Sequence, residues 1–539
     1  MGDHRPGAAV SLDPSSLAVV IARLTGVAEE MGAVLRRAAY SPNIKERADC
    51  SAALFTADGE LLVQAEHIPV HLGSMPASVQ AAIEAARDLP RPLGPGDQLV
   101  LNDPFAGGTH LNDLTLVAPC FVGGRLAGWA ANRAHHADVG GMVAGSIPPE
   151  AHQIHQEGLR IPPVLLTGEV AALLCANSRT PDERRGDLDA QVGANVVGVS
   201  RLAELVGAGA PLGEVCDYGE RRMRAALAEV PSGSWAFDDV LDRPATRPGE
   251  PPLPPTRIVL ELSISGEEAV FDFSGTDPER PDSLNAVRAV TVSSVAFALR
   301  AATDPTIPAN GGALRPVRVV APEATVVAAR YPAAVGAGNV EVSQRVADVC
   351  LGALGRALPG RVGAAGQGTM NNMMLGGRSP VPASGWGPTA AGSEWVYYET
   401  VGGGQGGRPG RAGMSGVHTA MTNTMNTPIE ALERAFPLRV RRYRLRRGSG
   451  GQGRWPGGEG IEREIEVLHP TTVSLVSDRR ESRPFGVAGG GPGAVGENWL
   501  LPGGDEARAR RLPGTVTLEL TAGDVVRVLT PGGGGYGAP

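Results

Sequence analysis

The sequence predicts an α+β protein with several lobes: a metal-bearing N-terminal lobe, a helical insert, and a strand- and Gly-rich C-terminal half. At 539 residues the chain exceeds the size at which one hydrophobic core stops growing. It contains 74 Gly and 45 Pro but only 4% aromatic residues, a balance that indicates many turns and ordered loops. Helical and alternating apolar patterns also follow one another along the chain. We place the lobes at residues 1–178, 179–231 and 232–539.

The N-terminal lobe is predicted to hold two helices and two β-hairpins. The helices are expected at 15–40 and 76–87, and the hairpins at 49–56 with 60–66 and at 114–122 with 125–136. The first helix places apolar residues on one face, and Ser74 lies near the start of the second as a typical capping residue. Asp58-Gly59 and Gly123-Gly124 are pairs that favour tight hairpin turns.

The helical insert opens at Thr180-Pro181-Asp182-Glu183, which combines a capping box with proline at the first helical position. Helix is expected from there to about Val230, and strands thereafter. A hairpin is predicted at 257–264 with 269–274, and a second capping box at 427–430 predicts a short helix. The Gly-rich stretches beyond contain Arg, Trp and hydrophobic residues, so we expect ordered loops rather than flexible linkers.

Charge and cysteine content exclude several classes of function. The net charge of −8 argues against nucleic acid as the main partner. No apolar run approaches the roughly 18 residues that a membrane span needs, and the N-terminus shows no export signal. Five cysteines without a CxxC pair are typical of reduced thiols in a cytoplasmic protein. The six arginines of Leu438 to Arg447 predict a solvated strand face at a boundary between subunits, with an anion-binding surface as the alternative.

The lysine content of the chain excludes a Walker A loop. A Walker A loop needs Gly-Lys-Ser/Thr, and the only lysine, Lys45, follows isoleucine. Two stretches match GxGxxG, at 402–407 and 448–453, but each runs into an Xaa-Pro pair instead of opening a helix. If ATP drives the reaction, we expect another chain to hold it.

Histidine placement predicts a metal site. Seven of the ten histidines lie between His67 and His155, and carboxylates accompany them at Asp49, Asp103, Asp113 and Asp138. Imidazole and carboxylate without thiolate form the ligand set of catalytic zinc, manganese or iron. Isolated histidines, such as His71, His152, His155 and His418, are more often structural, and Cys50 is expected to be a small buried thiol.

Hairpin geometry sharpens this prediction but leaves one choice open. If Gly123-Gly124 forms a two-residue turn, Asn112 faces His135 and Asp113 faces Ala134. His110, Asp113 and the His135-His136 pair then gather at the open end of one hairpin, and Asp49 lies at the open end of the other. Ideal alternation puts Asp113 on the same face as His136, whereas a bulge would select His135. The residues alone do not decide between the two histidines.

At these positions the chain resembles the family of hydantoinase B, the 5-oxoprolinase B-type domain and the metal-binding subunit of acetone carboxylase. The matching stretches run in order from Ser41 nearly to the C-terminus. They include SPNIKERADCSAALF, QAEHIPVHLGSM, LNDPFAGGTHLNDLTLVAPCF, NRAHHADVGGMVAGS, EGLRIPP, FDFSGT, GNVEVSQRVAD, SDRRESRPFGVAGGGPG and TPGGGGYG. The resemblance covers almost the whole chain.

The resemblance implies both a ligand set and a reaction. Matching the family's metal motif gives Asp49, His110, Asp113 and His135 as ligands of one divalent metal ion. His136 and Asp138, adjacent to them, would orient a ligand or carry a proton. The implied partner is a hydantoinase A-like ATPase subunit, which binds ATP and Mg and phosphorylates the substrate.

The reaction that the resemblance implies first is hydrolysis of a cyclic amide, such as 5-oxoproline, a hydantoin or a related lactam. The alternatives are ATP-dependent carboxylation of a ketone with bicarbonate, and a non-catalytic scaffold for the partner ATPase. An open coordination position argues against the scaffold, because structural zinc sites are usually closed by thiolates.

Overall fold

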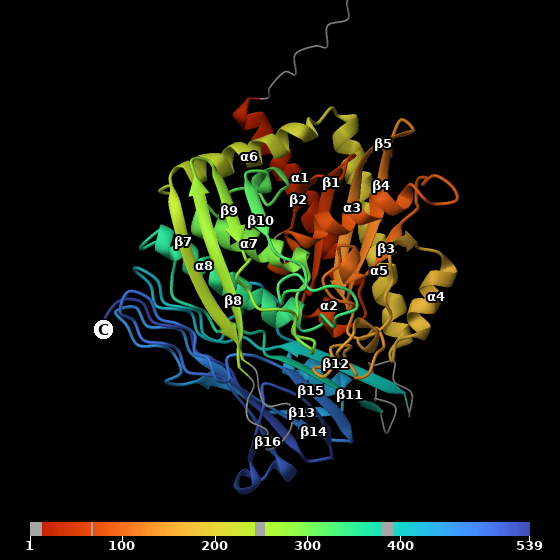
Figure 1. Ribbon diagram of the computed structural model, residues 1–539. Coiled ribbons are helices and arrows are strands. Elements are labelled where there is room, and N and C mark those ends of the chain that lie inside the picture. The colour runs from red at the N-terminus through yellow and green to blue at the C-terminus, as the bar shows by residue number, and fades with distance from the viewer. Residues whose placement is uncertain (1–12, 66–67, 243–253, 379–392) are drawn as a thin grey trace, which may run out of the picture.

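The computed structural model describes residues 13–65, 68–242, 254–378 and 393–539. Helices and strands are mixed along these segments, and the strands form four sheets, so the predicted α+β class is confirmed. In Figure 1 two helix-covered sheets, coloured red to green, lie above the blue C-terminal sheets. The division into lobes at residues 178 and 231 stays a prediction.

The first sheet has six strands in the order β2-β1-β5-β4-β3-β6. The strands are β1 (Cys50–Thr56), β2 (Leu61–Gln64), β3 (Leu99–Leu101), β4 (Asp113–Val122), β5 (Arg125–His135) and β6 (Val164–Leu165). Both predicted hairpins are present, β1 with β2 and β4 with β5. Because β1 also pairs with β5, the open ends of the two hairpins meet, and the His135 N–H donates to the Asp49 carbonyl oxygen at 3.0 Å.

Helices cover both faces of this sheet because its strands are apolar on both sides. Ala52 and Leu54 of β1 belong to a core shared with α1 (Pro14–Ala38) and α5 (Pro181–Gly207). Phe55 points the other way, into a core shared with α3 (Ser74–Ala86). The predicted first helix is therefore confirmed as α1, whose N-terminus is capped by the carboxylate of Asp13.

The helical insert consists of α5 and α6 (Leu212–Ala228). Two short helices lie on either side of the first sheet's strands in the sequence: α2 (Pro42–Lys45) precedes β1, and α4 (Gly168–Ala176) follows β6. The capping box predicted at Thr180 is wrong: α5 begins at Pro181 as expected, but the threonine side chain makes no bond to it and its hydroxyl is buried without a partner. Within the described residues no single helix is long and apolar enough to cross a membrane; α5 and α6 pass that test only as a pair bent by 96°.

The second sheet has the order β10-β9-β8-β7 and carries two helices. Its elements are β7 (Gly233–Leu241), β8 (Thr256–Ser265), β9 (Glu268–Asp272), β10 (Val317–Val320), α7 (Arg288–Ala302) and α8 (Ser343–Ala357). The predicted hairpin is confirmed as β8 with β9. A single π-helical turn, Gly338–Val342, leads into α8, and such turns occur frequently at functional sites.

The C-terminal half consists of two sheets packed face to face. One has the order β12-β11-β15-β18 and the other β13-β14-β19-β16-β17. The elements are β11 (Asn372–Arg378), β12 (Glu394–Thr400), α9 (Ile429–Ala435), β13 (Leu438–Arg446), β14 (Gly460–Val467), β15 (Thr471–Val476), β16 (Glu497–Leu501), β17 (Arg510–Leu512), β18 (Thr515–Leu520) and β19 (Val525–Leu529). Their inner faces share one apolar core, which includes Trp395 and Ile465. The short helix expected after residue 427 is α9, but the capping box predicted there is not formed, because Pro428 stands at the cap.

The arginine-rich segment is the edge strand β13, and its guanidinium groups pair with glutamates of the neighbouring strand. Arg442 contacts Glu462 at 2.7 Å and Glu464 at 2.9 Å. Arg444 contacts Glu462 at 2.6 Å. These cross-strand pairs support the strand-face interpretation over the anion-binding one, because Arg442 and Arg444 already have carboxylate partners.

The Gly-rich segments are ordered loops, as predicted. They run along one another and exchange backbone hydrogen bonds, such as Gly451 N–H to the Gly533 carbonyl at 2.8 Å and Gly533 N–H to the Gly458 carbonyl at 2.9 Å. They approach so closely that a Cβ atom at Gly457 would lie 1.9 Å from the Gly533 oxygen. Only glycine permits this contact, which explains the composition of these loops.

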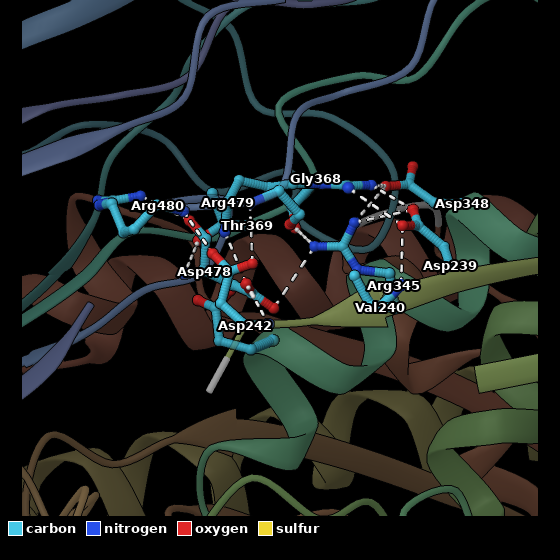
Figure 2. A network of polar contacts seen from close by, with 12 residues as sticks. Asp239, Val240, Asp242, Arg345, Asp348, Gly368, Thr369, Asp478, Arg479 and Arg480 are labelled. Carbon is cyan, nitrogen blue, oxygen red and sulfur yellow. Dashed lines mark hydrogen bonds and ion pairs between the residues drawn. The ribbon is translucent and has the colours of Figure 1, made fainter. Parts of the chain in front are cut away.

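Buried ion pairs join the second sheet to the C-terminal half (Figure 2). Arg479, which follows β15, contacts Asp239 of β7 and reaches Asp348 of α8 at 2.9 Å. Arg345 of α8 contacts the same Asp239 at 3.0 Å and Asp478 at 3.4 Å. Separating a buried ion pair leaves an uncompensated charge, which is energetically costly. The network therefore holds the second sheet and the C-terminal half in a fixed relative position.

Candidate metal centre

Asp113 and His135 lie directly opposite each other on β4 and β5. The pairing nearest the turn follows the predicted register, but a bulge then leaves Ala127 without a partner and shifts every later pair by one residue. The expectation that Asn112 faces His135 and Asp113 faces Ala134 is therefore wrong. The bulge is the physical reason, and it selects His135 as the neighbour of Asp113.

Three buried side chains converge at this end of the sheet. His110 Nε2 lies 3.1 Å from Asp113 Oδ1 and 3.2 Å from His135 Nδ1, and His135 Nδ1 lies 3.4 Å from Asp113 Oδ1. Such separations suit ligands that each lie about 2.0–2.2 Å from one shared metal ion. Burial alone would raise the pKa of the Asp113 carboxyl. The neighbouring imidazoles of His110, His135 and His71 nevertheless hold that pKa well below its usual value. His110, Asp113 and His135 thus form a candidate metal site.

The tautomer of His110 is set by the nitrogen that faces away from Asp113. Its Nδ1 lies 3.1 Å from the carbonyl oxygen of Gly336. A carbonyl oxygen only accepts, so in the neutral ring Nδ1 carries the hydrogen and Nε2 keeps its lone pair. That lone pair and the Asp113 carboxylate converge in a buried space, and this donor set fits a divalent cation.

Further side chains orient the Asp113 carboxylate. Thr109 Oγ1 donates to Asp113 Oδ2 at 2.5 Å, and His71 Nε2 lies 3.3 Å from the same oxygen. The other nitrogen of His71 lies 2.9 Å from Ser51 Oγ. His71, which clustering alone did not single out, therefore belongs to the site.

A cavity of ≈ 20 Å³ adjoins the triad where the first sheet, the π-helical turn and the C-terminal half meet. The π-helical turn contributes Asn339, whose Nδ2 lies 3.1 Å from His110 Nε2 and whose Oδ1 is buried without a partner. Strand β12 contributes Tyr398, and the segment Met421–Thr424 closes the wall. The sequence analysis did not predict these contributions. Asn339 lies in GNVEVSQRVAD, a stretch that carries the family resemblance. That resemblance is the one sequence signal that could have identified Asn339 as a site residue.

The remaining predicted site residues are placed differently. Asp49 lines the cavity but is not part of the cluster whose ligand atoms lie within 4.8 Å of one another, so its role as a ligand stays a prediction. His136 Nε2 lies 2.9 Å from Gln191 Oε1, and burial lowers its pKa to about 4. Asp138 bonds the Arg179 guanidinium at 2.9 Å. Neither His136 nor Asp138 is among the described residues that line the cavity, and their proton-transfer roles stay predictions.

The other candidates lie outside the triad. Burial raises the pKa of the Cys50 thiol to about 12, in keeping with a small buried thiol. His152 and His155 are exposed, and His418 is half-buried near Thr424. His67 lies outside the described residues.

Comparison with known proteins agrees with these features. A family model for hydantoinase B/oxoprolinase matches residues 13–539. The chain is 37% identical to 5-oxoprolinase 1 of Arabidopsis thaliana, over 98% of this chain and 42% of that protein. It is 30% identical to a Pseudomonas protein named as one subunit of a putative D-/L-hydantoinase, over 98% of this chain and 90% of that protein. The chain therefore spans less than half the length of the oxoprolinase and most of the hydantoinase subunit.

Two solved structures share the fold. The ATP-dependent caprolactamase from Pseudomonas jessenii superposes with a TM-score of 0.86 at 29% identity, covering 98% of this chain and 92% of that one. Nucleotide-free acetone carboxylase also superposes with a TM-score of 0.86, at 17% identity, covering 97% and 76% of the two chains. At that identity the second likeness concerns the fold alone. The chain belongs to the hydantoinase B/oxoprolinase family.

Proposed function

We propose that this chain is the metal-bearing subunit of an ATP-dependent amidohydrolase that opens a cyclic amide such as 5-oxoproline, a hydantoin or a related lactam. The observation that carries the proposal is the buried triad of His110, Asp113 and His135 beside a cavity. Relatives between 29% and 37% identical to the chain are named caprolactamase, hydantoinase subunit and 5-oxoprolinase, which supports a cyclic amide as the substrate.

The proposed partner is a hydantoinase A-like ATPase subunit that binds ATP and Mg. This chain has no Walker A loop, because its single lysine is Lys45. The oxoprolinases are more than twice as long as this chain, which leaves room for a second unit, and one relative of similar length is named as a single subunit of a hydantoinase. In the complex the partner would phosphorylate the amide oxygen and so turn a poor leaving group into a good one.

His110, Asp113 and His135 would hold one zinc, manganese or iron ion, with Asp49 as the fourth ligand. When bound, such an ion polarises a substrate oxygen or lowers the pKa of a coordinated water. His71 and Thr109 fix the Asp113 carboxylate, and Gly336 fixes the His110 ring, so the ligands are oriented before the ion arrives.

Ketone carboxylation with bicarbonate is the second candidate, favoured by the acetone carboxylase fold. It ranks lower because that likeness is only 17% in sequence. A non-catalytic scaffold ranks third, because structural zinc sites are usually closed by thiolates and the triad consists of two histidines and an aspartate. ATP turnover that depends on bicarbonate would favour the carboxylase, and turnover that depends on a lactam would favour the hydrolase.

The decisive experiment combines metal analysis with an activity assay. Wild type, His110→Ala and the exposed-site control His155→Ala are purified, analysed for metal and assayed with the partner, ATP and each cyclic amide. We expect about one metal ion per chain and ATP-dependent ring opening in wild type and control, and neither in His110→Ala. Full activity in His110→Ala would sink the site assignment. Activity in a further variant, with alanine at all four proposed ligand positions (Asp49, His110, Asp113 and His135), would rule out a metal mechanism.

A further inference from the structure

The carboxamide of Asn339 reaches the ligand atoms of the candidate metal site. Its Nδ2 lies 3.1 Å from His110 Nε2 and 3.4 Å from Asp113 Oδ2. These separations match those within the triad, where Asp113 Oδ1 lies 3.1 Å from His110 Nε2 and 3.4 Å from His135 Nδ1. The end of the Asn339 side chain is therefore as close to the ligand atoms of the triad as these are to one another.

The segment that carries Asn339 is held firmly in place. Asn339 belongs to the π-helical turn Gly338–Val342, and its side chain is buried. Its carbonyl oxygen accepts a hydrogen bond from the Ser343 hydroxyl at 2.7 Å. A Cβ atom at Gly338 would lie 1.7 Å from the Asn285 carbonyl oxygen, so the turn packs directly against a neighbouring loop. A side chain on such a supported element is positioned precisely, and single π-helical turns are frequent at functional sites.

The protein around Asn339 does not fix which end of the amide faces the triad. Nδ2 faces His110 and Asp113, while Oδ1 is buried and has no hydrogen-bond partner among the described residues. Half a revolution about the Cβ–Cγ bond exchanges the oxygen and the nitrogen, which have nearly the same size. Since one end lacks a protein partner in either orientation, the group that binds beside the triad decides which end faces it.

A cation beside the triad favours the oxygen end. His110 Nδ1 donates to the Gly336 carbonyl oxygen, so His110 Nε2 directs a lone pair toward Asn339 and Asp113. An N–H of Asn339 and a cation compete for this lone pair, and the cation also repels the N–H dipole. A carboxamide oxygen, by contrast, is an ordinary ligand of divalent cations. Turning the amide therefore replaces a hydrogen bond to His110 by a bond to the metal.

We propose that Asn339 is a further ligand of the metal ion and binds it through the carboxamide oxygen. The ligand set then consists of two imidazole nitrogens and three side-chain oxygens, from His110, His135, Asp113, Asp49 and Asn339. A neutral oxygen raises the number of protein ligands without changing the charge of the site. This inference rests on the proposed function for the presence of a metal ion and adds a ligand to it.

Cobalt(II) is the probe for the test, because its visible absorption becomes more intense when its coordination number falls. Titration of the purified full-length chain with cobalt(II) gives both the dissociation constant and the absorption per bound ion. Asn339→Leu replaces the amide by an apolar group of similar shape that keeps water out of its position. We expect cobalt affinity to fall at least about ten-fold, and the bound ion to absorb more intensely than in wild type. A wild-type spectrum in Asn339→Leu would overturn the inference, even with weaker binding, because the amide would then only support its neighbours.

Asn339→Asp keeps an oxygen in the same position and removes both N–H donors. If this oxygen binds the metal, the variant should absorb as wild type does and bind cobalt at least as tightly, because a carboxylate is a stronger ligand of such cations than a neutral amide. If the amide acts only as a donor to His110 and Asp113, the variant loses that hydrogen bond as Asn339→Leu does. A cobalt affinity as low as that of Asn339→Leu would overturn the inference.

Asn310→Leu is the matched control, because Asn310 is a buried amide that does not line the metal cavity. Its Nδ2 donates to the Val215 carbonyl oxygen at 2.9 Å, and its Oδ1 accepts the Ala313 N–H at 3.1 Å. The melting temperature of this variant should fall, because existing hydrogen bonds are lost. Its cobalt affinity and spectrum should stay those of wild type. The same spectral change in Asn310→Leu as in Asn339→Leu would overturn the inference, because the spectrum would then report a general loosening of the fold.

These measurements separate the inference from the proposed function, because they need neither ATP nor the partner. Loss of cobalt binding in His110→Ala, together with a wild-type spectrum in Asn339→Leu, would overturn the inference and leave the proposed function. The expected spectra without ring opening by the complete complex would sink the proposed function and leave Asn339 as a ligand. A wild-type chain that binds no cobalt would overturn both.

Discussion

The ring of Tyr398 stacks on that of His135, with centroids 4.5 Å apart and planes inclined by 17°. Tyr398 lies on β12 in the C-terminal half, and its carbonyl oxygen accepts a hydrogen bond from Arg47 at 2.8 Å. A residue far along the chain thereby orients a candidate metal ligand of the first sheet. The candidate metal site is thus complete only when the C-terminal sheets have docked.

Replacing Tyr398 should weaken metal binding. Tyr398→Leu removes the stacked ring, and since aromatic pairs contribute about 0.5–1.5 kcal/mol, metal affinity should fall by up to about ten-fold. Tyr398→Phe keeps the ring and should stay near wild type. Competition with a chromogenic chelator measures both affinities. Equal affinities of the Leu and Phe variants would show that stacking does not orient His135.

His71 should control the metal through Asp113 without binding it. His71→Ala removes the contact to Asp113 Oδ2 and should weaken metal binding by about 10- to 100-fold, as other losses of such supporting contacts do. His155→Ala is the matched control, because that histidine is exposed. Metal content after dialysis against graded chelator gives the comparison. If His71→Ala retains as much metal as wild type does, then Thr109 and not His71 orients the Asp113 carboxylate.

Deleting Ala127 should remove the bulge without separating Asp113 from His135. In the deletion variant Leu126 is followed directly by Gly128, so Cys120 still pairs with Gly128 and Asp113 still pairs with His135. The pairs between β5 and β1 are also kept, because they begin at Gly128. We therefore expect metal content near that of wild type, measured by elemental analysis. Loss of metal from a folded deletion variant would show that the bulge itself, and not only the pairing of Asp113 with His135, shapes the site.

Glu157 should make stability depend on pH. It is fully buried, its carboxylate accepts the Gly336 N–H at 2.8 Å, and burial raises its pKa to about 8 from an ordinary 4.5. Between these values the folded chain holds a proton that the unfolded chain has lost, so the free energy of unfolding falls as pH rises from about 4.5 to about 8.

Glu157→Gln removes the titrating group while keeping an acceptor for Gly336. Its unfolding free energy should decline less over the same pH window, by an amount on the order of a few kcal/mol. Denaturant unfolding of both proteins at pH 5, 6.5 and 8 provides the measurement. Parallel pH profiles would show that Glu157 is charged in the folded chain at neutral pH.

The hairpins and helices were predictable because their signals are local. Gly123 and Gly124 both adopt positive φ, at 57° and 79°, as a two-residue turn requires, and the periodicity before Tyr40 identifies α1. The bulge was not predictable, because alanine at 127 carries no conformational signature of its own. Nor does any local pattern link Asn339 or Tyr398 to the first sheet, since those contacts arise from the packing of distant segments.

The interleaved glycine loops have a consequence for biosynthesis. The final segment around Gly533 is hydrogen-bonded to Gly451 and Gly458, and its carbonyl lies where no side chain of Gly457 would fit. Those loops cannot close before the segment around Gly533 has left the ribosome, whereas the first sheet can form much earlier in translation. The nascent chain therefore exposes a formed N-terminal half before these loops close, and a polypeptide interrupted ahead of Gly533 would present unclosed loops to the quality-control machinery.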